Sequence, residues 1–253
     1  MVRKPVIAGN WKMHLTVPEA LELVRGIISS CSGKTGVEVV IGPPFTALHA
    51  VSCEIKGTGI GLAAQNMHYE PKGAFTGEIS APMLLDAGCT HVIIGHSERR
   101  QYFCETDEGV NRKVKAALAA RLTPIMCIGE TLTERESGVT FKTIETQLNG
   151  GLQGLTPEQA EKIIVAYEPV WAIGTGKTAG AEQAQEVHKF IREKLSGAFG
   201  SDAASRIRVL YGGSVKPDNV KSLMAMEDID GALVGGACLK AESFSALVNY
   251  QEV

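Results

Sequence analysis

The chain has 253 residues, and its composition of 44% hydrophobic and 21% charged residues is that of a globular protein with a large core. It carries 25 basic against 28 acidic residues, for a formal net charge of −3, and it shows no basic run. This balance argues against nucleic acid as a partner, so a bound anion would have to be held by local groups.

Short runs of apolar and β-branched residues recur along the whole chain and predict strands. In chain order they span residues 6–8, 37–41, 60–64, 91–94, 124–128, 163–167, 207–211 and 232–234. Most of these runs are continuously apolar rather than alternating. That pattern is typical of strands that are buried on both faces of a parallel sheet.

Between these runs the apolar residues recur with a helical period. The first such stripe is Ala20, Leu21, Val24, Ile27 and Ile28, and Thr16 with Glu19 offers a capping box at its start. Later stripes are Val110, Val114, Ala117 and Leu118, then Ala184, Val187, Ile191 and Leu195, then Val220, Leu223 and Met224 after Pro217. We interpret all of them as core-facing sides of helices.

Eight alternating units of strand and helix, each of about 32 residues, predict right-handed crossovers and a parallel sheet. Eight such units close into a (β/α)8 barrel, which we expect to form a single domain over residues 1–253. A doubly wound open sheet is the alternative. Such a sheet usually shows a G-x-G-x-x-G after an early strand, and the sequence has none.

Six cysteines occur, and none forms a C-x-x-C pair, so neither a zinc site nor a thioredoxin-like motif is indicated. We expect them to be small buried side chains in a reducing compartment. The N-terminus has no apolar signal region, and no apolar run approaches the roughly 18 residues that a membrane span needs. The sequence therefore predicts a cytoplasmic protein without membrane contact.

Polar residues and glycines gather after five of the predicted strands, at residues 9–12, 95–99, 167–171, 212–214 and 235–236. Enzymes with this barrel place their catalytic groups at the C-terminal ends of the strands. This convergence on one end of the barrel is the strongest functional signal that the residues alone provide.

Three side chains at this end are candidates for chemistry. Glu168 ends a buried strand, where burial can raise its basicity for general-base work, although a helix cap or a salt bridge is the alternative. His96 opens a short helix, whose N-terminus favours a neutral imidazole, although it could be purely structural. Lys12 could neutralise a substrate anion, or be an ordinary solvated lysine.

The glycines of 212–214 and 235–236 predict a phosphate site, because glycine lets backbone N–H groups approach an anion closely. Phosphate is frequently bound after strands seven and eight of such barrels, although plain turns would also use these glycines. Residues 169–179 read as a lid with apolar side chains. They are not a P-loop, because the motif needs a glycine where Trp171 stands.

Taken together, four motifs resemble the triosephosphate isomerase family. They are G-N-W-K at residues 9–12, I-G-H-S-E-R-R at 94–100, A-Y-E-P-V-W-A-I-G-T-G-K at 166–177 and Y-G-G-S-V at 211–215. With the glycine pair at 235–236 they occur in the family's order. The resemblance implies a TIM barrel that interconverts dihydroxyacetone phosphate and D-glyceraldehyde 3-phosphate through an enediolate, in glycolysis and gluconeogenesis, with no cofactor and no metal.

The resemblance also implies a role for each matching residue. Glu168 would be the base and His96 the electrophile, while Asn10 and Lys12 line the substrate and Glu98 supports the site near Lys12. Phosphate contacts would come from Gly174, Ser214, Gly235 and Gly236. The stretch 65–78 resembles the long third loop that inserts into a partner subunit in this family, which implies a homodimer.

Two alternatives remain at the level of sequence. Another phosphosugar barrel enzyme would share the phosphate loops but lack the G-N-W-K and Y-E-P segments. A non-catalytic phosphate-binding barrel would be expected to have lost Glu168 or His96, and both are present.

Overall fold

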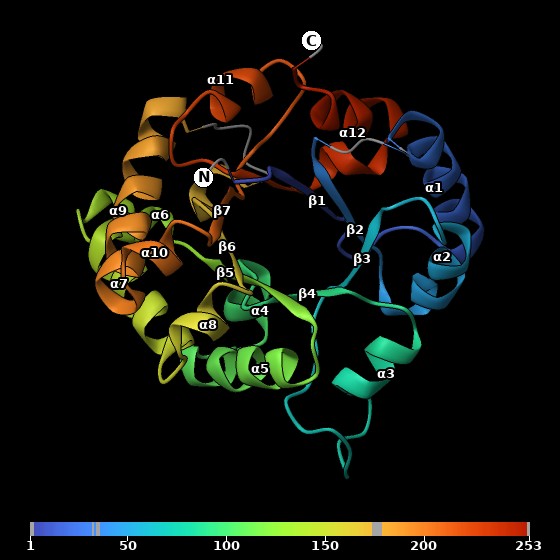
Figure 1. Cartoon of the computed structure of the whole chain (residues 1–253), viewed down its shortest axis with the longest axis horizontal. Coiled ribbons are helices and arrows are strands. Elements are labelled where there is room, and N and C mark those ends of the chain that lie inside the picture. The colour runs from blue at the N-terminus through green and yellow to red at the C-terminus, as the bar shows by residue number, and fades with distance from the viewer. Residues whose placement is uncertain (1–2, 32, 34–35, 174–178, 252–253) are drawn as a thin grey trace.

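A computed structural model describes residues 3–31, 33, 36–173 and 179–251 of the chain, and it shows a closed barrel of parallel strands ringed by helices (Figure 1). The strands neighbour one another in sequence order, and β1 pairs with both β2 and β8. Their bounds are β1 Val6–Asn10, β2 Glu38–Gly42, β3 Gly61–Ala64, β4 His91–Ile94, β5 Thr123–Ile128, β6 Ile164–Tyr167, β7 Arg208–Tyr211 and β8 Gly231–Val234. The predicted barrel is confirmed.

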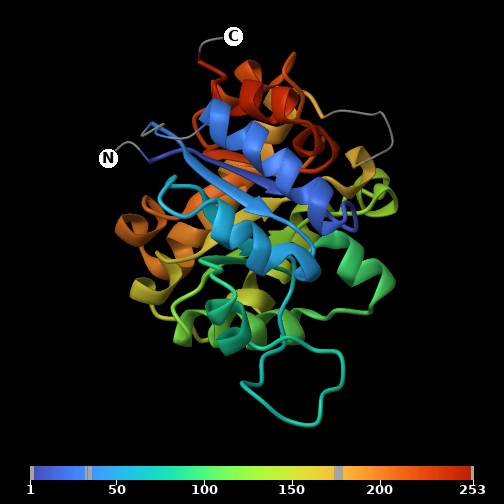
Figure 2. The same cartoon turned by 90° about the vertical axis from the view of Figure 1, so that its right-hand side faces the viewer.

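Helices follow the strands and cover the outside of the barrel (Figures 1 and 2). The α-helices are α1 Val17–Cys31, α2 Leu48–Glu54, α3 Ala81–Asp86, α4 Ser97–Tyr102, α5 Asp107–Ala119, α6 Leu132–Glu136, α7 Thr140–Leu152, α8 Pro157–Ala160, α9 Ala181–Phe199, α10 Ser201–Ala204, α11 Val220–Met224 and α12 Ala241–Val248. The described residues also include three short 3-10 helices, η1 Phe45–Ala47, η2 Val170–Ala172 and η3 Gly236–Leu239.

The middles of the strands are apolar because each strand is buried on two sides. Alternate strand residues fill the inside of the barrel, among them Ala8, Ile93 and Leu210. The residues between them point outward and pack against the helix stripes, as Ile7 and Val24 do in one continuous cluster. The core is therefore two concentric layers, which explains why the strand runs do not alternate between apolar and polar residues.

Inside the barrel, the N-terminal end is closed by charged groups. Glu38, His91 and Arg208 begin β2, β4 and β7, and the Glu38 carboxylate accepts from His91 Nε2 at 3.1 Å and from Arg208 Nη1 at 2.5 Å. The hydrogen bond from His91 outweighs burial and, with Arg208, holds the pKa of Glu38 at about 2. The side chains of Glu38, His91 and Arg208 therefore fill this end of the barrel and are bonded to one another through the Glu38 carboxylate.

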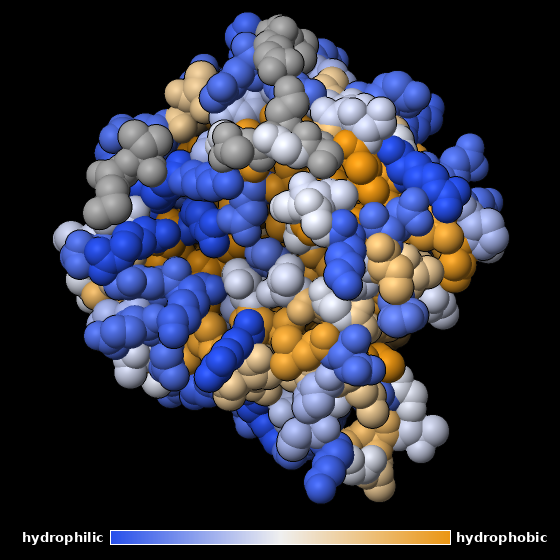
Figure 3. Space-filling model, turned by 45° about the vertical axis from the view of Figure 1, so that its right-hand side comes forward, coloured by the Kyte–Doolittle hydropathy of each residue, from blue (hydrophilic) through white to orange (hydrophobic). Residues whose placement is uncertain are grey.

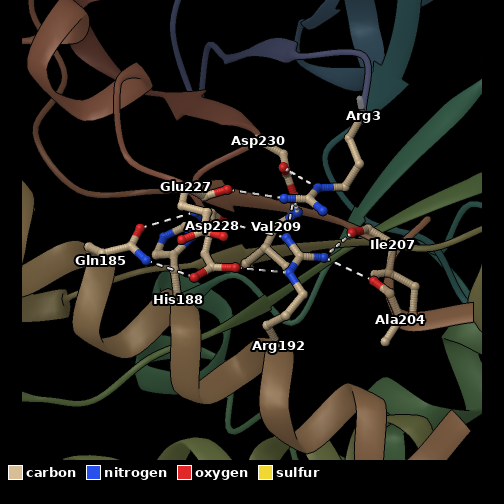
Figure 4. A network of polar contacts seen from close by, with 10 residues as sticks. All are labelled: Arg3, Gln185, His188, Arg192, Ala204, Ile207, Val209, Glu227, Asp228 and Asp230. Carbon is tan, nitrogen blue, oxygen red and sulfur yellow. Dashed lines mark hydrogen bonds and ion pairs between the residues drawn. The ribbon is translucent and has the colours of Figure 1, made fainter. Parts of the chain in front are cut away.

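A second polar network ties α9 to the N-terminal ends of β7, β8 and the chain start (Figure 4). Asp230, just before β8, accepts from the backbone N of Val209 at 2.8 Å and from Arg192 Nη2 at 2.6 Å, and its other oxygen accepts from Arg3. Arg192 also donates to the carbonyl of Ile207. The network fastens an outer helix to the barrel with bonds that packing alone would not supply.

One loop stands clear of the body between β3 and α3, at residues 65–80 (Figure 2). Residues 71–78 of this loop are all exposed, and Figure 3 shows it as a lobe at the lower right of the molecule. Most of the large exposed apolar side chains of the described residues lie on the connections that follow β1 to β4, and Leu132 and Phe141 lie apart from them on α6 and α7. Those after β1 to β4 are Met13, Phe45, Phe75, Met83, Leu85, Tyr102 and Phe103, and we call them the apolar side.

The cysteines differ in part from the sequence-based prediction. Cys89, Cys127 and Cys238 are buried as expected, and so is Cys31. Cys53 and Cys104 are exposed, because Cys53 lies on the outer face of α2 and Cys104 lies in the connection between α4 and α5. Among the described residues, no helix is both long and apolar enough to span a membrane.

Candidate active site

A cleft of about 570 Å³ opens at the C-terminal end of the barrel. It is lined by predicted site residues at the ends of β1, β4, β6, β7 and β8, namely Asn10, Lys12, His96, Glu168, Ser214, Gly235 and Gly236. Glu98 does not line the cleft but contacts it through Lys12. Gly174 lies outside the described residues. The fold therefore brings together side chains that the sequence separates by more than 200 positions.

Glu168 is buried at the end of β6, with 1% of its surface exposed. One carboxylate oxygen accepts from His96 Nε2 at 2.8 Å, and the other accepts from the backbone N of Ser97 at 2.8 Å. Its own backbone N donates to Ile128 O, so the residue continues the strand pairing before Pro169 turns the chain. A fully desolvated carboxylate with both oxygens engaged is held in one orientation.

His96 is the N-cap of α4, and its geometry settles which ring nitrogen carries the proton. Its Nδ1 accepts from the backbone N of Glu98 at 3.2 Å, and an amide N–H can only donate. Nδ1 is therefore unprotonated, and the proton sits on Nε2, which faces Glu168. An accepting Nδ1 is compatible with the neutral imidazole that the sequence predicts, whereas contact with the Glu168 carboxylate raises the pKa of His96 and favours the charged form.

The electrostatics of this pair depend on their contact. Burial alone lowers the pKa of His96, but the Glu168 carboxylate outweighs it and raises that pKa above its usual value. Burial raises the pKa of Glu168, but His96 and Ser97 N outweigh it, and the net shift is downward. The expectation that burial makes Glu168 a stronger base is therefore wrong for this arrangement, because its partners stabilise the charged form.

Lys12 is held by its backbone in an unusual conformation. Its φ of +54° lies in the left-handed region, which costs a residue with a β-carbon about 1 kcal/mol. The side chain of Asn10 accepts from Lys12 N at 3.0 Å, and Gln65 Nε2 donates to Lys12 O at 2.8 Å. Gln65 also donates to Gly42 O at 2.9 Å, so it joins the turn after β1 to the end of β2. Strain of this kind persists only where its surroundings enforce it.

The Lys12 ammonium reaches Glu98 in α4, with Nζ 2.6 Å from Oε1. Both side chains are partly exposed, at 24% for Lys12 and 40% for Glu98. The charge of Lys12 is thus paired at the edge of the cleft in this structure. An incoming anion would compete with Glu98 for it.

Two of the glycines are needed for close approach rather than for a turn. A β-carbon on Gly212 would lie 2.9 Å from Cγ of Glu168 and 3.0 Å from the Tyr167 carbonyl oxygen. A β-carbon on Gly213 would lie 2.2 Å from the Tyr211 hydroxyl. The segment after β7 therefore packs directly against the Glu168 side chain. Beyond it, Asn219 bridges Ser214 O and Lys216 N at 3.0 and 2.8 Å and shapes this loop.

The start of the predicted lid is more ordered than the sequence suggested. Val170–Ala172 form η2, and Trp171 Nε1 donates to the buried Glu130 carboxylate at 2.8 Å. Tyr167 OH donates to the same oxygen at 3.1 Å. Trp171 thus packs against the body of the protein, while Ile173 lines the cleft. Residues 174–178 of the predicted lid lie outside the described part.

The chain is similar to known proteins over almost its whole length. The sequence model of the family described as triosephosphate isomerase matches residues 5–251. Relatives named "Triosephosphate isomerase" include one from Citrifermentans bemidjiense, 62% identical, and one from Geotalea uraniireducens, 59% identical. Each alignment covers 99% of this chain and 100% of the relative. The chain belongs to the triosephosphate isomerase family.

A solved triosephosphate isomerase from Bartonella henselae superposes with a TM-score of 0.90 at 43% identity, over 99% of this chain and 100% of that one. The likeness therefore extends from sequence to the whole barrel. The chain is an isomerase that interconverts triose phosphates, a reaction of glycolysis.

Several residues of this site are not predicted by the sequence. Gln65 holds the turn of Lys12, and Ser97 N holds the Glu168 carboxylate. Lys216, Leu233 and Lys240 line the cleft. None of them stands out in the sequence, because a backbone donor or a wall position leaves no signature in residue type. In the described part, no group of three or more His, Cys, Asp or Glu side chains could hold a metal ion.

Proposed function

We propose that Glu168 is the base that removes a proton from the carbon beside the substrate carbonyl, turning dihydroxyacetone phosphate into an enediolate. The main support for this proposal is the buried pair of Glu168 and His96 on the wall of the cleft, in which Glu168 Oε1 lies 2.8 Å from His96 Nε2. The hydroxyl proton on the first carbon's oxygen passes to the former carbonyl oxygen, with His96 as the proposed carrier, and the base returns its proton to the neighbouring carbon, which gives D-glyceraldehyde 3-phosphate. Atoms and electrons balance without a cofactor.

His96 takes the role of electrophile in this proposal. Its Nε2–H donates to Glu168 in this structure, and the same N–H becomes available to the substrate oxygen when the carboxylate turns to the carbon. When the Glu168 carboxylate moves away from His96, the main influence that raises the pKa of His96 is lost. Burial and the N-terminus of α4 remain, and both disfavour the charged imidazolium. The imidazole then stays neutral as it donates.

Lys12 and Asn10 complete the substrate site on the β1 side. We propose that the Lys12 ammonium faces negative charge of the substrate, with Glu98 holding it in place until then. Phosphate contacts are proposed for Ser214, Gly235 and Gly236, which line the far side of the cleft. Gly174 is proposed from the family resemblance as a further phosphate contact.

Two properties of the whole protein belong to the same proposal. The apolar side and the protruding loop at 65–80 support a homodimer, since large exposed apolar patches mark interfaces. A cytoplasmic location is supported by the glycolytic reaction and by cysteines such as Cys53 and Cys104, which carry thiols rather than disulfides. One barrel domain is proposed to span residues 1–253.

Replacing Glu168 with glutamine tests the base. Glu168→Gln keeps the size of the side chain but cannot take a proton, so kcat should fall at least about a hundredfold, the low end for a positioned base. Inorganic phosphate should inhibit the variant competitively with a constant within about threefold of the original protein.

The matched control is Glu193→Gln, the same change at an exposed position on α9, which should leave kcat unaltered. Deuterium uptake into dihydroxyacetone phosphate in D2O, followed by NMR, reports proton removal directly. A Glu168→Gln protein that exchanges deuterium at the original rate would remove Glu168 from the mechanism.

A further inference from the structure

Among the described residues, three lysines line the cleft, and they differ in their partners. Lys12 is paired with Glu98. Lys216 and Lys240 are exposed, and among the described residues neither has a carboxylate within ion-pair distance. Two uncompensated positive charges therefore stand at the mouth of the cleft in a chain whose net charge is −3.

The two lysines stand on adjacent sides of the proposed phosphate contacts. Lys216 follows Ser214 in the loop after β7, and Lys240 follows Gly235 and Gly236 after β8. Because β7 and β8 are neighbours in the barrel, these loops lie next to each other at its C-terminal end. A phosphate bound by Ser214 and the glycine pair would have one lysine toward each flank.

The placement of Lys240 is unfavourable for the fold. It is the N-cap of α12, and no side-chain hydrogen bond caps that helix. The N-terminal end of a helix carries partial positive charge, which favours acidic groups and disfavours a lysine by several tenths of a kcal/mol. Residues that break a local rule in this way are expected at functional or strained sites, and Lys240 lines the cleft.

Lys216 is held in place by its backbone. Asn219 Oδ1 accepts from Lys216 N at 2.8 Å, and Asn219 Nδ2 donates to Ser214 O at 3.0 Å. The backbone of Lys216 is thereby tied to that of Ser214, while its long side chain remains exposed at the cleft mouth. A fixed backbone with an exposed charged side chain would let Lys216 contact an anionic ligand before that ligand reaches Ser214, Gly235 and Gly236.

From these observations we propose that Lys216 and Lys240 form an outer cation pair that captures the phosphate dianion of the incoming triose phosphate and delivers it to the inner phosphate contacts. The proposal rests on the phosphate site proposed above. Triosephosphate isomerase is itself among the enzymes whose kcat/KM reaches the diffusional ceiling of about 10⁸–10⁹ M⁻¹ s⁻¹. At that ceiling the rate of encounter limits the enzyme, and focused charge at a cleft raises this rate.

The test is the double variant Lys216→Gln/Lys240→Gln, assayed with D-glyceraldehyde 3-phosphate at ionic strengths from about 0.01 to 0.3 M, where the Debye length falls from about 30 Å to below 8 Å. We expect kcat/KM to drop about fivefold to tenfold at the lowest ionic strength and about twofold at the highest. The loss should appear in kcat/KM more than in kcat, and the dependence on salt should flatten.

The matched control is Lys56→Gln/Lys162→Gln, which removes the same charge from exposed positions just before β3 and β6, at the opposite end of the barrel. It should keep the original salt dependence. Unphosphorylated D-glyceraldehyde is a second control, because a neutral substrate is not attracted by the lysines. Lys216→Gln/Lys240→Gln and Lys56→Gln/Lys162→Gln should both convert it at the rate of the original protein.

The outcomes separate the two proposals. If the original protein shows competitive inhibition by inorganic phosphate and the cleft variant retains its salt dependence, the phosphate site stands and the outer cation pair is wrong. If inorganic phosphate does not inhibit the original protein competitively, the inner site itself is wrong. A cleft variant that loses activity equally with both substrates has been damaged structurally, which also overturns the capture role.

Discussion

The side chains of Glu168 and His96 are held in a resting arrangement that already contains the groups of the reaction. The proton on His96 Nε2 binds the carboxylate, and the paired charges of Lys12 and Glu98 stand beside them. In the proposed mechanism the substrate takes over both contacts, with its carbonyl oxygen on Nε2 and its negative charge on Lys12. In each pair, Glu168 with His96 and Lys12 with Glu98, the hydrogen bond keeps a reactive group oriented. The substrate must break that hydrogen bond before it can take the place of the partner.

We predict that Lys12→Met weakens binding of phosphorylated ligands severely. Loss of a charged hydrogen bond costs about 1.5–3 kcal/mol, so the inhibition constant of inorganic phosphate should rise about tenfold to a hundredfold. The removal also leaves the Glu98 carboxylate unpaired beside the cleft, where it repels the anion.

The contribution of Glu98 is separated by a second variant. In Lys12→Met/Glu98→Gln the repulsion is absent, so affinity for phosphate should recover in part relative to Lys12→Met. The measurement is inhibition by inorganic phosphate at constant ionic strength. Unchanged affinity in Lys12→Met would show that backbone amides and the outer lysines suffice to bind the anion.

At the scale of elements, α9 combines an apolar stripe with a polar attachment to the barrel. Its predicted stripe is buried at Ala184, Val187, Ile191 and Leu195. His188 lies on the same side, fully buried, and its Nδ1 donates to Asp228 O at 3.2 Å (Figure 4). No described group binds its Nε2, and burial lowers the pKa of His188 to about 4.

We predict that His188 makes folding sensitive to mild acid. Its pKa is about 4 in the folded protein and near 6.5 when unfolded, so between these values the unfolded chain takes up a proton that the folded protein does not. The free energy of unfolding should therefore be unaffected by His188 above pH 6.5. It should decrease by about 3 kcal/mol as the pH falls from 6.5 to 4.

The test is urea unfolding of His188→Asn at pH 7 and pH 5, with protein concentration held constant. Asparagine retains a donor toward Asp228 O but does not titrate. In the original protein the free energy of unfolding should be lower at pH 5 than at pH 7. In His188→Asn this decrease should be smaller by about 2 kcal/mol, whatever the absolute stability of the variant. His49→Asn, a change at an exposed histidine on α2, should retain the original difference. Equal pH dependence in His188→Asn and the original protein would refute the assignment.

At the scale of the whole molecule, the apolar side breaks the symmetry of the barrel. Its side chains all belong to connections after β1 to β4, which are consecutive neighbours around the barrel. Met13 is 94% exposed and adjoins Lys12 in the sequence. A partner that covers this side would therefore also support the turn that carries Lys12, and this links assembly to the site.

We predict a homodimer, with a mass by light scattering of twice 26.9 kDa. Phe75→Asp/Met83→Asp places two charges on the loop and α3, and should give a monomer at micromolar concentration, because unpaired charges are costly at the core of an interface. Phe141→Asp changes another exposed apolar residue, on α7 and outside the apolar side, and this variant should remain dimeric. An original protein that is monomeric at these concentrations contradicts the proposal.

The sequence by itself determined the barrel and most of its contents. Continuous apolar runs identified the strands to within a residue or two, because burial on both faces removes polar residues from them. Glu168, His96 and Lys12 were found because groups at the ends of parallel strands must converge on one end of a closed barrel. Local pattern and topology are sufficient for such conclusions.

Only the tertiary structure decided how these groups are held and charged. Gln65 and Ser97 N reach the site across the barrel, so their hydrogen bonds depend on distances between residues that are remote in sequence. The pKa of Glu168 moved opposite to expectation for the same reason, since burial can be read from its neighbours in the chain but His96 lies 72 positions away. Desolvation follows from local pattern, whereas pairing depends on which groups the closed barrel places within 3 Å of one another.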